Sequence, residues 1–385
     1  TALAETLGFT VADTFMQSRS APDPRTFIGR GKLEQMSFAI TEKQIDLVLF
    51  DHDLSPKQSQ LIESTLDCMV WDRTQVILEI FARHARTSEA KTQVELARLE
   101  YMLPRLVGLW AHLDRERGGI GASRGMGEKQ INIDRHIIRK RINKLQKDLK
   151  KIGRERTTRK KNRRDCFQIG LVGYTNAGKS TLMNLLTGNQ LPTADQLFAT
   201  LDSTTRTISG IAKPEMVISD TVGFIRNLPH ALVASFRSTL DVVQEADLLL
   251  HVVDASHPAT DEHIATTLEV LEKIGSDTIP QILLLNKTDL VSGGTERLIL
   301  EKRFPGAILT SARDPRTREL ITNRLKKAFQ SHFFSRTIKL PYSKCSSLSA
   351  LYAHSIVGNI AYRDDAIYVD CTISHANKNK FAELL

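Results

Sequence analysis

Eight residues near the middle of the chain, GYTNAGKS from Gly173 to Ser180, have the types and spacing of a phosphate-binding loop. They follow the apolar run FQIGLV and precede the helix-forming segment TLMNLL. Glycines in such a loop let backbone N–H groups turn toward phosphate oxygens, next to the positive end of the helix dipole. Lys179 is predicted to bridge the β- and γ-phosphates, and the Ser180 hydroxyl to ligate Mg²⁺.

A second motif, DTVG from Asp220 to Gly223, follows the strand-like segment MVIS. Alone it is most simply an aspartate in a strand-end turn, but after a phosphate loop its carboxylate is predicted to hold Mg²⁺ through water. The glycine N–H would lie near the γ-phosphate. The next residue, Phe224, cannot orient an attacking water, so we expect slow intrinsic hydrolysis and an activating group from elsewhere.

Two later motifs predict which base is bound. NKTD, Asn286 to Asp289, follows the apolar run ILLL. The carboxylate of Asp289 offers two acceptor oxygens to the N1 and N2 protons of guanine, and adenine would leave it unpaired, so discrimination should be large. Lys287 can lay its methylenes over the purine. TSA, Thr310 to Ala312, is predicted to supply backbone N–H groups to the guanine carbonyl oxygen.

Between the phosphate loop and DTVG lies LFATLDSTTR, from Leu197 to Arg206. A threonine of this segment is predicted to close over the γ-phosphate and Mg²⁺, as part of a mobile loop. The composition leaves Thr200, Thr204 and Thr205 open for that role.

The elements around these motifs alternate strand and helix from Asp165 to about Phe334, a pattern typical of a parallel sheet with crossover helices. The expected strands are FQIGLVG, MVISD, LLLHVVD and QILLLN. After residue 335 we expect a strand at TIKL, a helix from about Leu348 to Gly358 and a strand at AIYVDCTI.

The N-terminal residues 1–80 predict a small α/β domain, with a helix around Lys32 to Ile40 and a strand from Asp46 to Phe50. Two amphipathic helices should follow. Apolar residues recur at three- and four-residue steps in both, at Leu96, Leu99, Leu103 and Leu106, and then at Ile138, Ile142, Leu145, Leu149 and Ile152.

These two helices are predicted to pair antiparallel as a hairpin, with Pro104 kinking the first near its end. The interval between them, GGIGASRGMGEKQ from Gly118 to Gln130, is rich in glycine and is expected to form an irregular loop at the exposed tip. The sequence therefore predicts four parts: an N-terminal α/β domain (1–80), a helical hairpin with a basic second helix (81–164), a P-loop G domain with a mainly parallel sheet (165–334) and a small C-terminal α+β domain (335–385).

Charge is distributed unevenly along the chain. Its 385 residues carry a net charge of +9, from 53 Lys and Arg against 44 Asp and Glu. Residues 135–164 alone hold 15 basic and 2 acidic side chains, which leaves 38 against 42 elsewhere. A solvated helix face is the ordinary interpretation of such a run; beside a glycine loop it favours binding to an RNA phosphate backbone. No apolar run is long enough for a membrane span, and the scattered cysteines lack zinc-ligand spacing.

Several longer segments resemble the HflX family, ribosome-associated GTPases of the Obg-HflX branch. They are FIGRGKLEQ from Phe27, DRTQVILEIFARHARTSEAKTQVELARLEYMLPRL from Asp72, GGIGASRGMGEKQINIDR from Gly118, and FATLD with Phe224 after DTVG. The resemblance covers nearly the whole chain. It departs in the loop, where the family usually has GPGETQLETDR and this chain has GMGEKQINIDR.

The resemblance implies a Mg²⁺-dependent GTPase that converts GTP to GDP, with Thr200 as the switch threonine. Asn176 implies K⁺ as a further charge-stabilising ion. Lys179 and Thr200 are then the expected catalytic residues, and Ser180, Thr200 and Asp220 the metal ligands. The predicted nucleotide-binding residues are Gly173, Tyr174, Thr175, Asn176, Ala177, Gly178, Lys179, Ser180 and Thr181; Phe198, Ala199, Thr200, Leu201 and Asp202; Asp220, Thr221, Val222 and Gly223; Asn286, Lys287, Thr288 and Asp289; and Thr310, Ser311 and Ala312.

The resemblance also implies partners. We expect binding to the large ribosomal subunit and its rRNA, with the hairpin and glycine loop directed toward the peptidyl-transferase region, and splitting of stalled ribosomes. The free protein is expected to be a monomer with no membrane partner, in the cytoplasm, or in an organelle if a targeting segment has been removed. The alternative is an rRNA-binding or ribosome-assembly module that uses guanine nucleotide mainly as a structural ligand.

Overall fold

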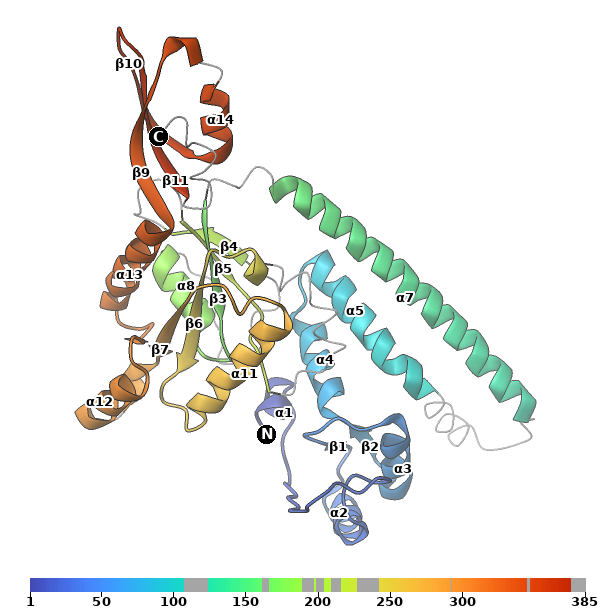
Figure 1. The fold of residues 1–385 in the computed structure, drawn as a ribbon. Coiled ribbons are helices and arrows are strands. Elements are labelled where there is room, and N and C mark those ends of the chain that lie inside the picture. The colour runs from blue at the N-terminus through green and yellow to red at the C-terminus, as the bar shows by residue number, and fades with distance from the viewer. Residues whose placement is uncertain are drawn as a thin grey trace. The chain divides into compact units, whose positions relative to one another are not determined.

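The chain divides into two compact units. The first comprises Thr1–Glu155, Asp195–Asp202 and Asn227–Ser238, and the second Arg156–Ala194, Ser203–Arg226 and Thr239–Leu385. A computed structural model describes residues 1–106, 124–160, 166–188, 197–198, 204–208, 216–226, 242–291, 293–344 and 347–374 of the chain. Figure 1 labels most of the helices and strands of both units.

The first unit begins with a small α/β part. Two short parallel strands, β1 (Leu47–Leu49) and β2 (Met69–Trp71), pair directly. Helices α2 (Arg30–Lys43) and α3 (Pro56–Leu66) cover them, and α1 (Ala2–Thr6) precedes both. Their apolar side chains form one core that includes Leu33, Val48, Ile62 and Val70. The helix and strand predicted within residues 32–50 are both present.

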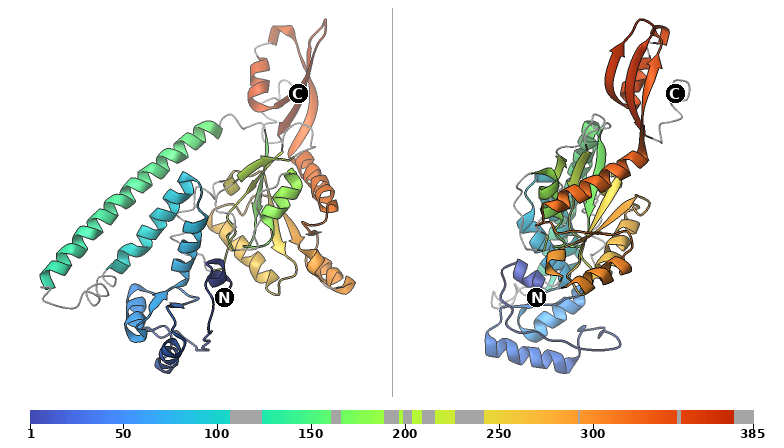
Figure 2. Two further views of the ribbon diagram at one scale, coloured as in Figure 1. Left: turned by 180° about the vertical axis from the view of Figure 1, so that it is seen from behind. Right: turned by 90° about the vertical axis from the view of Figure 1, so that its left-hand side faces the viewer.

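A long helical hairpin completes the first unit. After α4 (Arg73–His84) come α5 (Ser88–Met102), the short 3-10 helix η1 (Leu103–Arg105) and α7 (Arg124–Lys160). Views from two sides show α5 and α7 lying side by side (Figures 1 and 2). Leu96, Ile142 and Leu145 form their buried seam. The predicted pairing of the two amphipathic stripes is therefore confirmed.

One prediction about this hairpin was wrong. Residues 124–130, GMGEKQ with the preceding arginine, were expected to be irregular, yet they form the first turns of α7. Each glycine costs about 1 kcal/mol in a helix relative to alanine, but Met, Glu, Lys and Gln are good helix formers, and they continue into a strongly periodic segment. The rest of the expected tip loop, 118–123, lies outside the described residues.

The second unit is built on a six-stranded sheet with the order β4-β5-β3-β6-β7-β8. Its strands are β3 (Phe167–Val172), β4 (Thr204–Thr207), β5 (Met216–Asp220), β6 (Leu248–Asp254), β7 (Gln281–Asn286) and β8 (Ile308–Leu309). Only the edge strand β4 runs antiparallel to its neighbour. The four strands expected from apolar runs are present, and the mainly parallel sheet is confirmed. Part of the segment expected to be a mobile loop, from Thr204 onward, is instead strand β4.

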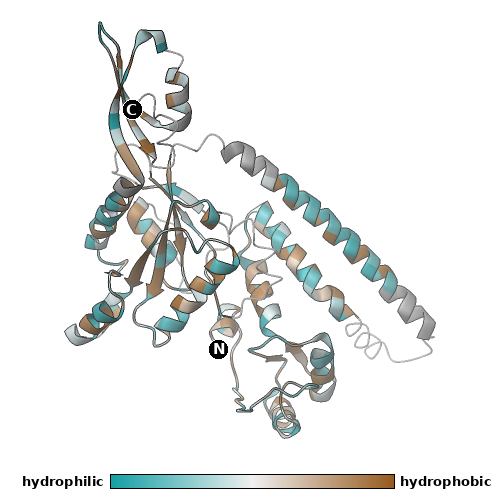
Figure 3. Ribbon diagram, in the orientation of Figure 1, coloured by the Kyte–Doolittle hydropathy of each residue, from teal (hydrophilic) through white to brown (hydrophobic). Residues whose placement is uncertain are grey.

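Helices cover both faces of this sheet. Leu182 of α8 (Lys179–Thr187) and Leu325 of α13 (Arg316–His332) join the main core on one face. On the other, Ile264 of α11 (Thr260–Lys273) and Leu300 of α12 (Gly294–Arg303) pack against Val253 and Leu285. The short 3-10 helix η3 (Thr288–Leu290) follows β7. In Figure 3 the strands are coloured mostly as hydrophobic, as a sheet covered on both faces requires. Among the described residues, no helix is long and apolar enough to cross a membrane.

The C-terminal part is a three-stranded antiparallel sheet with the order β10-β11-β9. It contains β9 (Phe333–Leu340), the 3-10 helix η4 (Tyr342–Lys344), α14 (Ser347–His354), β10 (Ile356–Tyr362) and β11 (Ile367–Ser374). The helix predicted as far as Gly358 ends at His354, because the next residues pair with β11. Helix α13 leads into β9 without a linker, and the ring of Phe333 stacks on Phe329 while both rings meet Phe167 edge-on.

Candidate guanine-nucleotide site

The predicted motifs come together at one edge of the sheet in the second unit. The phosphate loop follows β3, DTVG follows β5, NKTD follows β7 and TSA follows β8. These strands are parallel, so their carboxyl ends lie along the same edge, where open α/β sheets bind their ligands. The topology of the sheet thus brings four motifs that are predicted to form a guanine-nucleotide site to the same edge.

Glycine is required at both ends of the phosphate loop. Gly173 has φ +145°, and a Cβ there would lie 2.1 Å from the carbonyl oxygen of Val252. Gly178 has φ +91°, and a Cβ there would lie 2.3 Å from Nδ2 of Asn286. The loop therefore runs against β6 and against the base-recognition motif more closely than any other residue type would permit.

Lys179 begins α8 and is buried. Its Nζ donates hydrogen bonds to the carbonyl oxygens of Gly173, at 3.1 Å, and Tyr174, at 2.7 Å. The ammonium group is therefore held over the loop whose N–H groups are expected to bind phosphate. Burial lowers the pKa of Lys179 to about 8, and the nearby Asp220 carboxylate opposes this shift.

The two described side chains expected to hold Mg²⁺ are in direct contact. The Ser180 hydroxyl donates to Oδ2 of Asp220 at 2.5 Å, and Asp220 is only 1% exposed. A hydroxyl and a carboxylate oxygen are hard donors of the kind that Mg²⁺ takes together with phosphate oxygens and water, so this pair fits the metal. When bound, Mg²⁺ would neutralise charge on the β- and γ-phosphate oxygens.

The segment Leu197–Arg206, which is predicted to contain the switch threonine, is described only in part. Thr200, the third expected metal ligand, lies outside the described residues together with Ala199, Leu201 and Asp202. Thr204 and Thr205 belong to β4, where the Thr205 hydroxyl bonds to that of Ser219 at 2.8 Å. Phe198, also predicted to contact nucleotide, belongs to the first unit, and its ring meets Phe81 of α4 edge-on at 4.7 Å.

Asn286 connects the phosphate loop to the base-recognition motifs. Its amide nitrogen donates to the carbonyl oxygen of Ala177 at 2.9 Å, and its amide oxygen accepts from the N–H of Ala312 at 3.1 Å. Asp289 is oriented in turn by the Ser311 hydroxyl, which donates to Oδ1 at 2.7 Å. The three motifs are thus fixed to one another before any base is considered.

Asp254, at the end of β6, was not predicted from the sequence as a site residue. Its carboxylate forms an ion pair with Lys287 at 2.8 Å and accepts from the Ser256 hydroxyl at 2.6 Å. Burial raises the pKa of Asp254, but these hydrogen bonds outweigh it and hold the pKa below its usual value. The ion pair fixes the lysine expected to lie over the purine. The position of Asp254 at a carboxyl strand end was the one available signal.

A cluster of rings beside the phosphate loop was also missed. The ring of Tyr174 stacks on His263 of α11 at 3.8 Å, and His257 lies 4.4 Å from His263. The Tyr174 hydroxyl accepts from the backbone N–H of Arg226. Burial, assisted by His257, lowers the pKa of His263. No motif signals the stack of Tyr174 on His263, because these two residues are far apart in the sequence.

Phe224 is buried and joins DTVG to the phosphate loop. Its carbonyl oxygen accepts from the N–H of Thr175 at 2.8 Å, and its own N–H donates to the carbonyl oxygen of Gly173 at 3.1 Å. The phenyl side chain has no polar atom, and at 2% exposed the residue has little access to solvent. The expectation that this position cannot orient a water agrees with that placement.

His251 of β6 lies beneath this site and is 2% exposed. Its Nε2 has no hydrogen-bond partner among the described residues. Burial, and next the charge of Lys179, lowers the pKa of His251 to about 4. The ring is therefore neutral at physiological pH.

Comparison with protein-family models divides the chain into three matches. Residues 1–82 match the model of a GTP-binding GTPase N-terminal region, and residues 84–163 that of a GTP-binding GTPase middle region. Residues 168–287, which contain most of the nucleotide site, match the model of a 50S ribosome-binding GTPase.

The chain is also similar to individual proteins. A solved GTP-binding protein of the archaeon Sulfolobus solfataricus, in complex with GDP, is 28% identical over 85% of this chain and 93% of its own, with a TM-score of 0.43. GTPase HflX of Flavobacterium psychrophilum is 47% identical, over 74% of this chain and 69% of the relative. GTPase HflX of Escherichia coli is 42% identical, over 88% of this chain and 80% of the relative. At the identity and coverage of these two relatives, the chain belongs to the HflX family of GTPases.

Proposed function

We propose that this GTPase binds the large ribosomal subunit in a GTP-dependent manner, hydrolyses GTP to GDP there and splits stalled ribosomes. The observation that carries the proposal is the combination, in one chain, of a guanine-nucleotide site with a basic helical hairpin. The match of residues 168–287 to a 50S ribosome-binding GTPase supports the choice of partner.

The basic charge is presented on the hairpin. The described middle of α7 is coloured mostly as hydrophilic in Figure 3, and its apolar residues Ile142 and Leu145 face α5. Lys140, Lys144 and Lys147 are exposed at steps of four and three residues, which places them on one face. Such a face can follow an RNA backbone, which is recognised more by shape and phosphate contacts than by groove edges.

The nucleotide site supplies the switch in this proposal. Lys179 and the Ser180–Asp220 pair would hold the phosphates and Mg²⁺, and Thr200 would close on the γ-phosphate and be released on hydrolysis. Asn176, exposed in the loop with φ +59°, is the position proposed to recruit K⁺. Because Phe224 offers no group to orient water, we propose that ribosomal contact accelerates hydrolysis.

The test is to mix the purified protein with 70S ribosomes and with 50S subunits, in GTP, a non-hydrolysable GTP analogue, GDP or no nucleotide. We expect cosedimentation with 50S subunits to be strongest with the analogue, ribosome splitting by light scattering only with GTP or the analogue, and GTP turnover to rise at least tenfold with 50S subunits. Equal binding in all four nucleotide conditions would contradict the proposal.

The buried, apolar Phe224 favours one other function. A protein that binds rRNA and uses guanine nucleotide only to stabilise its fold would need no group at that position. In that case 50S subunits would bind without changing GTP turnover, and Lys179→Ala would weaken nucleotide binding but spare binding to the subunit.

A further inference from the structure

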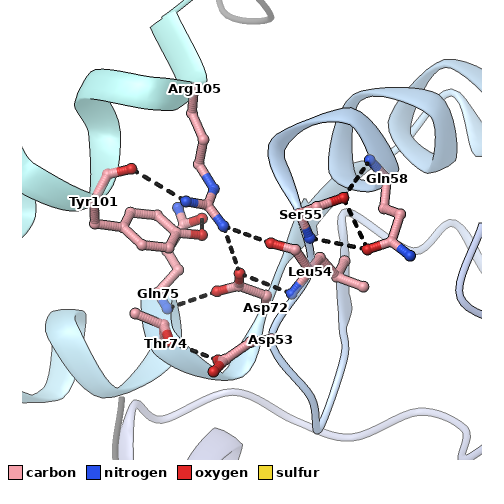
Figure 4. A network of polar contacts seen from close by, with 9 residues as sticks. All are labelled: Asp53, Leu54, Ser55, Gln58, Asp72, Thr74, Gln75, Tyr101 and Arg105. Atoms are coloured by element: carbon pink, nitrogen blue, oxygen red, sulfur yellow. Dashed lines mark hydrogen bonds and ion pairs between the residues drawn. The ribbon is translucent and has the colours of Figure 1, made fainter. Parts of the chain in front are cut away.

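The side chain of Asp72 joins two parts of the first unit. It stands between β2 and α4, is 1% exposed, and accepts from the backbone N–H of Gln75 at 2.9 Å, which caps α4. It also accepts from the N–H of Leu54 at 3.2 Å and from Nη2 of Arg105 at 3.0 Å. Figure 4 shows these bonds converging on one carboxylate. The loop after β1, the start of α4 and the end of the hairpin's first arm therefore meet at Asp72.

Arg105 is fixed from several directions. Its Nη2 donates to the carbonyl oxygen of Leu54 at 2.6 Å as well as to Asp72, and its Nη1 donates to the carbonyl oxygen of Tyr101 at 3.2 Å. The guanidinium lies 3.7 Å from the centre of the Tyr101 ring. A planar guanidinium that donates to three acceptors while stacking on a ring is held in place in a way that a lysine ammonium cannot be.

The loop that receives Arg105 is itself fixed. Ser55 and Gln58 form a capping box at the start of α3, and the Thr74 hydroxyl donates to Asp53 at 2.6 Å. Burial, and next the charge of Asp72, raises the pKa of the Tyr101 hydroxyl, so the ring under Arg105 stays neutral. Arg105 therefore ties the end of the arm to a rigid part of the α/β domain rather than to a movable loop.

A second ion pair, between α4 and α5, is more exposed. Nη2 of Arg98 on α5 is 2.7 Å from Oε1 of Glu79 on α4, with the side chains 44% and 24% exposed. Exposed pairs of this kind contribute little to holding helices in place. The side chains of the Arg105–Asp72 pair are only 19% and 1% exposed, so this pair is more deeply buried than the Arg98–Glu79 pair in the same unit.

We propose that Arg105 and Asp72 are positioning residues that clamp the end of the hairpin's first arm to the N-terminal α/β domain. This proposal rests on the proposed function, because it assigns the α/β domain the role of holding the hairpin in place for ribosome binding. A hairpin that is already held in place loses less conformational entropy when it binds. Its affinity for the ribosome is therefore higher.

The test uses variants that remove the clamp without leaving a buried charge. In Asp72→Ser with Arg105→Met, serine keeps the cap of α4 and both charges are gone, so the chain should fold. Arg105→Lys is the conservative variant, and Arg98→Met is the matched control at the exposed pair. Spin labels at Lys57→Cys on α3 and Lys140→Cys on α7, with the four native cysteines replaced by alanine, report the distance between the α/β domain and the hairpin.

We expect the double variant to widen the distribution of label-to-label distances at least twofold, Arg105→Lys to recover part of the original width, and Arg98→Met to leave it unchanged. In ribosome splitting, the protein concentration for half-maximal effect should rise about tenfold in the double variant, with the maximal rate and the basal GTP turnover within twofold of the parent. A loss of maximal rate alone would point to a different role and overturn the proposal.

The two proposals fail separately. An unchanged distance distribution in the double variant would overturn the clamp, whatever the ribosome assay gives. If the parent protein splits no ribosomes, the proposed function fails, and the label distances still decide whether the clamp exists. Equal half-maximal concentrations in an active parent and in the double variant would show that the clamp does not serve ribosome binding.

Discussion

Asp289 is the residue on which base selection should depend most. Asp289→Asn replaces one acceptor oxygen with an N–H₂ group, so one of the two guanine protons loses its partner and the other loses a charged one. Each hydrogen bond to a charged group is worth about 1.5 kcal/mol or more, so affinity for GDP should fall by about 100-fold or more. The new donor should favour the 2-carbonyl oxygen of xanthine, so affinity for xanthosine diphosphate should rise. Titration with fluorescent forms of both nucleotides measures this.

Ser311 provides the matched control for that change. Its hydroxyl donates to the Asp289 carboxylate and accepts from the backbone N–H of Arg313, so Ser311→Ala should weaken GDP binding by about tenfold or less without creating affinity for xanthosine diphosphate. If the Asp289→Asn protein keeps its full preference for GDP, the NKTD motif does not recognise the base.

His251 should make the second unit sensitive to acid. Its folded pKa of about 4 lies below its ordinary value of 6.5, so the unfolded chain takes up the proton first as pH falls from 6.5 toward 4. The contribution to stability lost by pH 5 is about 2 kcal/mol relative to pH 7.5. His251→Leu should remove this part of the pH dependence. Urea unfolding followed by hydrogen exchange of peptides from β3 and β6, at both pH values, measures the difference.

His136, exposed on α7 in the first unit, is the control for this measurement. His136→Gln should leave the acid sensitivity of β3 and β6 as it is in the parent. If His251→Leu loses as much stability between pH 7.5 and pH 5 as the parent does, the burial of a neutral imidazole is not the cause.

At the level of elements, the exposed face of α7 should account for part of the salt dependence of ribosome binding. Replacing Lys140, Lys144 and Lys147 with glutamine removes three cations and leaves the seam with α5 intact. Each phosphate that is no longer neutralised should lower the slope of log affinity against log salt by about 0.7 to 0.9, so the slope should fall by roughly 2. Binding to 50S subunits at several salt concentrations tests this.

Three lysines of the second unit are the control: Lys302 on α12, with Lys326 and Lys327 on α13, which are exposed as well. Their replacement by glutamine changes the net charge by the same amount. If both triple variants shift the salt slope equally, net charge and not the position of α7 explains the effect.

Elements with strong local patterns were predictable from the sequence. Apolar runs such as QILLLN become β7, and the leucine and isoleucine stripes become the α5–α7 seam. The misses have physical reasons. The strand at Ile356–Tyr362 depends on pairing with β11, and β8 is only two residues long, so neither has a pattern of its own. The first turns of α7 were not predicted, because their glycines are typical of an irregular loop.

The nucleotide site was predictable to the extent that its motifs are local. The phosphate loop, DTVG, NKTD and TSA each follow a strand, as expected, and the parallel sheet brings them together. The stack of Tyr174 on His263 and the ion pair of Lys287 with Asp254 were not predictable, because each joins residues whose proximity exists only after folding. The clamp at Asp72 and Arg105 is of the same kind, although both residues lie in one segment that resembles the family.

For the whole molecule, the two units should be separable by function. Replacing residues 118–127 with ten glycine and serine residues alters the first unit, whereas the phosphate and base motifs lie in the second. GTP affinity and basal turnover should stay within twofold of the parent, and ribosome splitting should fall by at least about tenfold, because the replacement tip is not preorganised for binding. Nucleotide titration and light scattering on the same preparations measure both. Full splitting by the replaced form would refute a role for the tip.

Because α13 continues directly into β9, few positions in this region can be cleaved without destabilising the fragments. Phe329 lies in the last turn of α13 and Phe333 is the first residue of β9, and both rings contact Phe167, the first residue of β3. A fragment of the second unit that ends just before Phe333 would lose this ring and expose part of the Phe167 and Phe329 rings that it covers. One trimmed after β9 would keep that cover but present an eight-residue strand with no partner, a surface prone to self-association. Proteolysis should therefore yield no stable piece from this region.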